Sequence, residues 1–169
     1  GEYAYLAQSF HIAVLDISGE EIEKIGEFDL PNEPNLMFIQ EKYLFAFYQW
    51  SDSSLQVFEI SDSSTVESLG RYALPSEWPQ RVHKSGNLFY HASKDTVTIL
   101  DGTNPAEVMT KATIPLPGIQ SAAGIDSTLI AGTEDSLFVF NISNLENPSQ
   151  IYKSDFPRSS GIAFKDNLA

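Results

Sequence analysis

Four acidic or amide side chains at matching places along the chain are the first candidates for chemistry. Asp16, Glu59, Asp101 and Asn141 each lie at or near the end of a short apolar run. Carboxylates that converge from several strands bind metal ions or act as general acids and bases. Asp and Asn before a turn also accept hydrogen bonds from nearby backbone amides, which is a purely structural role. Because each repeat holds one such group, the four are spread apart, and we favour the structural interpretation.

Two histidines, His83 and His91, are weak candidates for a metal site. They lie eight residues apart on two expected strands, joined by the tight turn Ser85-Gly86-Asn87. A hairpin can bring them together, but a metal needs a third ligand. The sequence holds no cysteine and no G-x-S-x-G, P-loop, H-E-x-x-H or EF-hand motif. We therefore assign no metal, cofactor or catalytic residue from the sequence.

Aromatic and arginine side chains in the expected loops are the candidates for binding a partner. Side chains of these types, held in loops on a rigid scaffold, are common in recognition surfaces. Both tryptophans of the chain lie in the longest loops of its second repeat. The alternative is that the two tryptophans pack over the ends of the sheets as covers. The candidates are Phe10, Tyr48, Trp50, Trp78, Arg81 and Arg158.

The elements that would position these residues come from an internal repeat of about forty residues. Its apolar run starts at Ile12, Leu55, Val97 and Leu137, which are 43, 42 and 40 residues apart. Two further markers keep nearly the same period. One is a dipeptide ending in proline, at Leu30-Pro31, Leu74-Pro75, Leu116-Pro117 and Phe156-Pro157; the other is an earlier strand-like run such as Tyr3–Ala7.

Each repeat reads as four short strands. The second repeat shows them at 35–40, 43–48, 55–60 and 66–74, with short links that suit antiparallel hairpins. The first repeat begins at its second strand. Four short antiparallel strands per forty-odd residues are typical of β-propeller blades. The expected fold is all-β: a β-propeller of about four four-stranded antiparallel blades, part of a larger ring of six to eight. The expected units over residues 1–169 are 1–34, 35–79, 80–118 and 119–160, with 161–169 starting or closing a further blade.

The repeats resemble those of the LVIVD-repeat family of bacterial and archaeal β-propellers. Tyr3–Ala7 and Val14–Ser18 match its strand motifs, and Asn104-Pro105 and Asn147-Pro148 match its Asn-Pro turn. The first two repeats lack Asn-Pro. The resemblance implies an extracellular, cell-surface or periplasmic propeller without an assigned activity, with its further blades in the same full-length chain.

The net charge of the chain limits the kinds of molecule that it is expected to bind. Ten Lys and Arg against 23 Asp and Glu leave a net charge of −13, which repels phosphate backbones and argues against nucleic acid. No run of apolar residues is long enough for a transmembrane helix. We expect a non-catalytic scaffold that binds a protein, peptide or glycan. Two alternatives stay open: a propeller enzyme, such as a metal-dependent hydrolase or lactonase with its site in the central channel, and a structural spacer.

Overall fold

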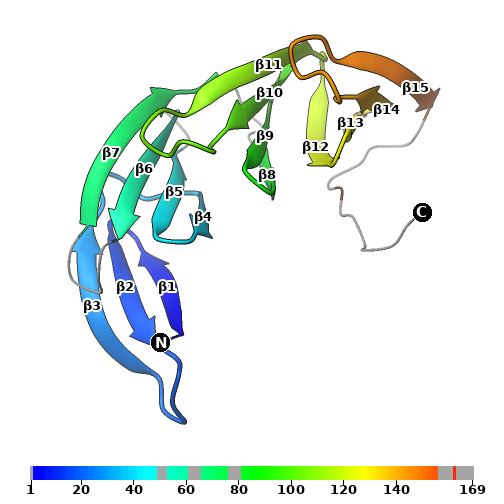
Figure 1. Cartoon of the computed structure of the whole chain (residues 1–169). Helices are drawn as coiled ribbons and strands as arrows, with labels where there is room; N and C mark the ends of the chain where they lie inside the picture. Colours follow the sequence, from blue (N-terminus) through cyan, green and yellow to red (C-terminus); the bar gives the residue numbers. More distant parts are fainter. Residues whose placement is uncertain (1, 49–52, 61–65, 76–80, 156–161, 163–169) are drawn as a thin grey trace. The chain divides into compact units, whose positions relative to one another are not determined.

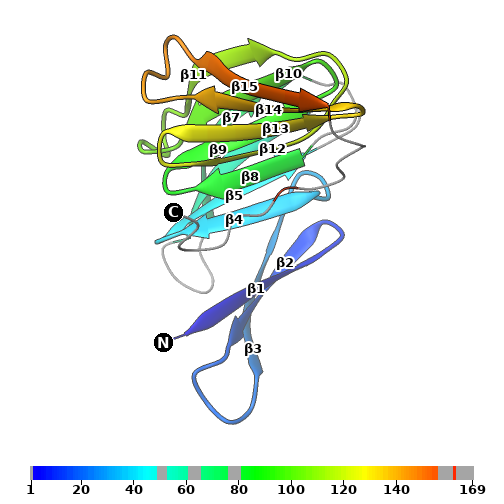
Figure 2. The ribbon, with the colours of Figure 1, turned by 90° about the vertical axis from the view of Figure 1, so that its right-hand side faces the viewer.

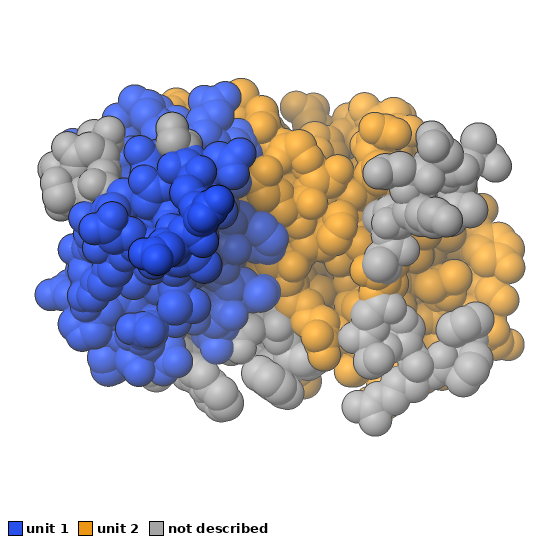
Figure 3. Space-filling model, turned by 90° about the horizontal axis from the view of Figure 1, so that it is seen from below, with its two compact units in different colours: residues 1–76 blue, residues 77–169 orange. Residues whose placement is uncertain are grey.

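The computed structural model describes residues 2–48, 53–60, 66–75, 81–155 and 162. It divides the chain into two compact units, residues 1–76 and 77–169, which are coloured separately in Figure 3. Every strand pair in both units is antiparallel and joins neighbours in the sequence (Figure 1).

The first unit holds a three-stranded and a four-stranded sheet. The first sheet runs β1 (Tyr3–Gln8), β2 (His11–Asp16), β3 (Glu23–Asp29). The second runs β4 (Leu36–Gln40), β5 (Tyr43–Tyr48), β6 (Ser54–Ile60), β7 (Val66–Ala73). Among the described residues, the first sheet has no counterpart of β4.

The second unit holds two four-stranded sheets (Figure 2). The third sheet of the chain runs β8 (Arg81–Ser85), β9 (Leu88–Ser93), β10 (Thr96–Asp101), β11 (Met109–Pro115). The fourth runs β12 (Ile119–Ile125), β13 (Thr128–Thr133), β14 (Ser136–Asn141), β15 (Ser149–Asp155).

The repeat in the sequence is a repeat in backbone geometry. The pairing between the last two strands of every sheet shifts register at the equivalent place, directly after Val14, Val57, Ile99 and Val139. Such a bulge inserts one residue into the outer strand and increases its twist. The leucine of the Leu-Pro marker is buried in each of the first three repeats. The backbone amide of this leucine donates a hydrogen bond to a carbonyl that lies just before the third strand of the repeat. The acceptors are Phe10 for Leu30, Ser53 for Leu74 and Asp95 for Leu116. The marker therefore ties the end of each outer strand to its own sheet.

Alternate residues of a strand point to opposite faces of its sheet. We call the face with Tyr5, Phe45, Tyr90 or Ile130 the front face, and the face with Ala4, Leu44, Phe89 or Leu129 the back face.

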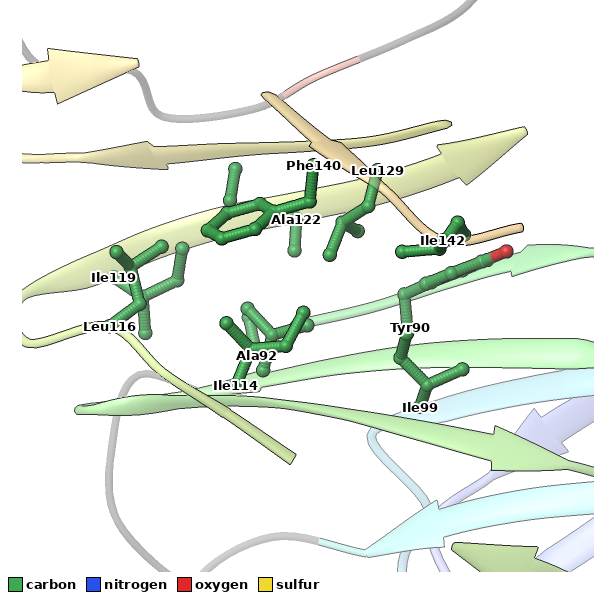
Figure 4. Close-up of a cluster of buried hydrophobic side chains, with 12 residues drawn as sticks. Tyr90, Ala92, Ile99, Ile114, Leu116, Ile119, Ala122, Leu129, Phe140 and Ile142 are labelled. Atoms are coloured by element: carbon green, nitrogen blue, oxygen red, sulfur yellow. The ribbon is translucent and has the colours of Figure 1, made fainter. Parts of the chain in front are cut away.

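Within each unit, the front face of one sheet packs on the back face of the next. In the first unit, Ile12 on the first sheet clusters with Leu44, Ala46 and Phe58 on the second. In the second unit, Tyr90, Val97 and Ile99 cluster with residues of the fourth sheet (Figure 4). Full burial of one such aliphatic side chain contributes roughly 1.5–3 kcal/mol. Stacking of sheets therefore supplies the core that a single sheet lacks.

Candidate functional site

The recurring acidic and amide groups are engaged in turns. Oδ1 of Asp16 accepts from the amide of Ser18 at 2.8 Å and from its hydroxyl at 2.6 Å. Asp101 and Asn141 accept from the amide two residues on, each at 2.9 Å. The hydrogen bonds from the Ser18 side chain and backbone lower the pKa of Asp16. These contacts confirm the structural interpretation for the three residues.

Glu59 differs from the other three members of the column. Its carboxylate pairs with Lys42 Nζ at 2.5 Å, across the second sheet. The hydrogen bond and the charge of Glu59 raise the pKa of Lys42. Asp101 combines both roles, because its Oδ1 accepts the turn hydrogen bond and its Oδ2 lies 3.4 Å from Lys111 Nζ. The contacts described at this repeat position are therefore turn hydrogen bonds and ion pairs.

The register separates the two histidines proposed as weak metal candidates. His83 pairs with Tyr90, and His91 pairs with Val82, so the two imidazoles lie on opposite faces of the third sheet. The expectation that the hairpin brings them together is wrong. His83 pairs with Tyr90, the residue just before His91, and neighbouring residues of a strand point to opposite faces of the sheet. Among the described residues, no three His, Cys, Asp or Glu side chains gather in a way that would hold a metal ion.

Each histidine has its own environment. His83 lies 6.1 Å from the Tyr90 ring, centroid to centroid, and burial lowers its pKa. His91 is fully buried, and burial lowers its pKa to about 4. His91 is therefore neutral at physiological pH and forms part of the packed interior. The third histidine, His11, which sequence reasoning did not single out, lies 2.6 Å from Asp29 and 3.7 Å from Glu27.

Phe10 stands on a fixed turn at one end of the first sheet. Gln8 pairs with His11, so Ser9 and Phe10 form the tip of the hairpin, and Ser9 has a φ of 55°. The Phe10 carbonyl accepts a hydrogen bond from the Leu30 amide at 2.7 Å. The Phe10 ring is 52% exposed. The hydrogen bond fixes the backbone that carries the ring, so less backbone entropy is lost when a partner covers Phe10.

The other predicted binding residues have different positions. Arg81 is exposed at the start of β8, in the second unit. Tyr48 ends β5 on the back face with Leu44 and Ala46, is 2% exposed and has its pKa raised to about 12 by burial. Its placement in a binding loop is wrong, because Tyr48 is the last residue of the strand expected at 43–48 and its side chain is packed in the core of the first unit. Trp50, Trp78 and Arg158 lie outside the described residues.

One close contact gave no signal in the sequence. Gly124 on β12 lies against the Tyr90 ring of the third sheet, and a Cβ at position 124 would stand 2.6 Å from Cε2 of that ring and nearer still to Cζ and Cε1. A single sequence contains nothing that links a glycine to an aromatic ring 34 residues earlier in another sheet. The pair belongs to the packing of the third sheet on the fourth.

Comparisons with known proteins give the class of fold. No protein-family model matches the chain, and no curated protein matches it. It is similar to a solved protein from Lactobacillus plantarum, with a TM-score of 0.66 and 15% identity, over 88% of this chain and 49% of that one. It is also similar to a chain in the structure of S. cerevisiae Dbp5 bound to Nup159, Gle1, IP6 and ADP (TM-score 0.62, 12% identity, 90% and 41% coverage). A third match is the N-terminal domain of Nup159, with a TM-score of 0.61, 12% identity and 90% and 41% coverage.

These neighbours have β-propeller-like folds, and the all-β sheets of this chain are consistent with part of a larger propeller. The chain spans about half, or less, of the length of each of them. In the part of the chain that the structure describes, no helix is long and apolar enough to cross a membrane.

Proposed function

We propose that residues 1–169 form a run of LVIVD-type propeller repeats that acts as a non-catalytic binding scaffold. The observation that carries the proposal is Phe10, an exposed aromatic ring on a turn fixed by the Leu30–Phe10 hydrogen bond. The repeated acidic positions support it, because their described contacts are turn hydrogen bonds and ion pairs.

The proposed partner is a protein, peptide or glycan, bound at the loops that join the second strand of a sheet to the third. Phe10 lies in such a loop, and the sequence predicts that Trp50 lies in the equivalent loop of the second repeat. Trp78, Arg81 and Arg158 stay further candidates on sequence grounds, because the sequence places them in or next to the links between repeats. The Dbp5–Nup159–Gle1 complex is a precedent for protein partners of a propeller-like chain.

The location that we propose is extracellular, cell-surface or periplasmic, following the resemblance to LVIVD repeats. Protease treatment of intact cells that express the full-length protein tests it. Loss of the protein from intact cells is the expected result, and protection until the cells are lysed would contradict it.

Binding is tested by alanine variants and a matched control on one sheet. Phe10→Ala is expected to raise the dissociation constant of a partner isolated with the purified chain by about tenfold or more, without lowering the melting temperature of the chain. Ile22→Ala is the control, because Ile22 is 70% exposed in the β2–β3 link at the opposite end of the sheet. Trp50→Ala and Trp78→Ala extend the test. Equal affinity of the Phe10 variant and the native chain would reject the proposed surface.

A further inference from the structure

The chain contains one acceptor motif for an N-linked glycan, at the end of β14. The motif is asparagine followed two residues later by serine or threonine, with any residue except proline between them. Asn141-Ile142-Ser143 fits this pattern. Asn147-Pro148-Ser149 has the same spacing, but its proline excludes it, and no other asparagine of the chain has serine or threonine two residues later. Asn141 is therefore the only residue in this sequence that fits the motif.

The repeat explains the serine of this motif but not its asparagine. Asp16 and Asp101 occupy the position of Asn141 in the first and third repeats. Each accepts a hydrogen bond from the backbone amide of a serine or threonine two residues on, as Asn141 does. The turn uses a single side-chain oxygen in all three cases. Aspartate supplies this oxygen as well as asparagine does, so the turn itself does not require a side-chain amide.

The side-chain nitrogen of Asn141 is available in the folded chain. Asn141 and Ser143 are exposed, whereas Ile142 between them is buried and anchors the segment in the core of the second unit. Oδ1 of Asn141 accepts the Ser143 amide at 2.9 Å. Nδ2 is on the other branch of the same planar group, and among the described residues no hydrogen bond from it is found. A glycan on Nδ2 would therefore leave both the turn and the core intact.

A sheet packed on the front face of the fourth sheet would not enclose this position. Asn141 is the last residue of β14, and Asp16 and Asp101 are the last residues of β2 and β10. Both aspartates are only half-buried, although the next sheet covers the front face of each sheet that carries them. The position thus lies at the margin of the stacked faces, so a glycan there is compatible with a further sheet.

The folded sheet limits when a transferase can act on Asn141. The backbone of Asn141 is paired with Thr128 on one neighbouring strand and with Ser149 on the other. An enzyme that surrounds the motif has to separate these pairs, which requires local opening of the fourth sheet. Transfer to the newly made chain, before β14 is paired on both sides, avoids this opening.

We infer that Asn141 carries an N-linked glycan, added by an oligosaccharyltransferase of the cell. The inference rests on the location proposed above, because this modification belongs to secreted and surface proteins. In the transfer, Nδ2 forms a bond to C1 of the first sugar, and the bond between C1 and a diphosphate oxygen of a polyprenyl-linked oligosaccharide breaks. The diphosphate leaves with the electron pair of that bond, and Nδ2 loses one proton to a base of the transferase.

Mass spectrometry of the full-length protein, isolated from the cells that make it, tests the inference. Fragmentation of a peptide that contains both Asn141 and Asn147 is expected to place a glycan on Asn141 and to leave Asn147 unmodified. Asn147 is a matched internal control, because it is exposed and has a serine two residues later, as Asn141 does.

Three variants of the same protein separate the glycan from the turn. Asn141→Asp keeps the side-chain oxygen of the turn, and Ser143→Ala keeps the backbone amide that donates to it. Both are expected to lose the whole mass of the glycan. Ser143→Thr retains the motif and is expected to keep the glycan.

An unmodified Asn141 in the mature protein would overturn the inference. Protease treatment of intact cells reports the location separately, so an unmodified Asn141 in a protease-sensitive protein would leave the proposed location standing. A glycan that persists in Ser143→Ala would overturn the assignment to this motif.

Discussion

Replacing Gly124 by alanine tests the stacking of the third and fourth sheets at a single atom. The new methyl group would stand 2.6 Å from Cε2 of Tyr90, a contact that neither the buried ring nor the strand backbone can accept without moving. Tyr90 is 1% exposed, so its ring has no free space to enter. Overpacking of this kind costs about 1–3 kcal/mol. Without the ring, the same change would stabilise the strand by roughly 0.5–1 kcal/mol, because glycine loses more backbone entropy on folding.

A double-mutant cycle measured by urea unfolding separates these two contributions. Gly124→Ala should lower the free energy of unfolding in the native background and in Tyr90→Phe, which keeps the ring. In Tyr90→Ala it should be neutral or stabilising, so the coupling energy should be about 1.5 kcal/mol or more. Gly19→Ala is the control, because a Cβ there meets its nearest neighbour at an ordinary 3.7 Å. Additive effects of the Gly124 and Tyr90 changes would refute the contact.

Three further changes test other parts of the structure. Burial lowers the pKa of His91 from 6.5 to about 4, so the unfolded chain takes up a proton at a higher pH than the folded chain does. The free energy of unfolding is therefore expected to fall by up to about 3 kcal/mol as the pH is lowered from above 6.5 towards 4. In His91→Leu, the difference between urea midpoints at pH 7 and pH 4.5 should shrink; an unchanged difference contradicts a buried neutral imidazole. Asn141→Ala should cost about 1 kcal/mol through loss of the turn to Ser143, whereas Asn141→Asp should keep it, as Asp16 does. Leu116→Ala should cost about 2–5 kcal/mol in thermal unfolding, since its side chain is 7% exposed in the core of the second unit.

The strands could be predicted because their signals lie within a few residues of each other. The four strands expected at 35–40, 43–48, 55–60 and 66–74 are observed as β4, β5, β6 and β7, with bounds that differ by at most one residue. The segment Glu20–Ile25, whose pattern suits a helix in isolation, lies in a loop and the start of β3, as its place in the repeat indicates. The period of the repeat thus predicted the secondary structure of this segment better than its local helix propensity did.

The candidate site was harder to predict because it depends on faces and close contacts. The spacing of His83 and His91 gives their distance along the chain, but only the pairing of Val82 with His91 shows that they lie on opposite faces. Tyr48 ends the strand expected at 43–48, next to a loop, but the sequence does not show that its side chain packs in the core with Ala46. Phe10 is exposed at the tip of a two-residue hairpin turn, and its role in binding stays a prediction.

Binding at the loop end of the sheets is tested most directly by nuclear magnetic resonance on the isotope-labelled chain with a partner recovered by affinity capture. Amide shifts on titration are expected to concentrate at Ser9 and Phe10, with further changes at Arg81. The amides around Ile22 and in β12 should not move. Shifts confined to the first strands of the sheets, β4, β8 and β12, with Phe10 unaffected, would contradict a loop-borne binding surface.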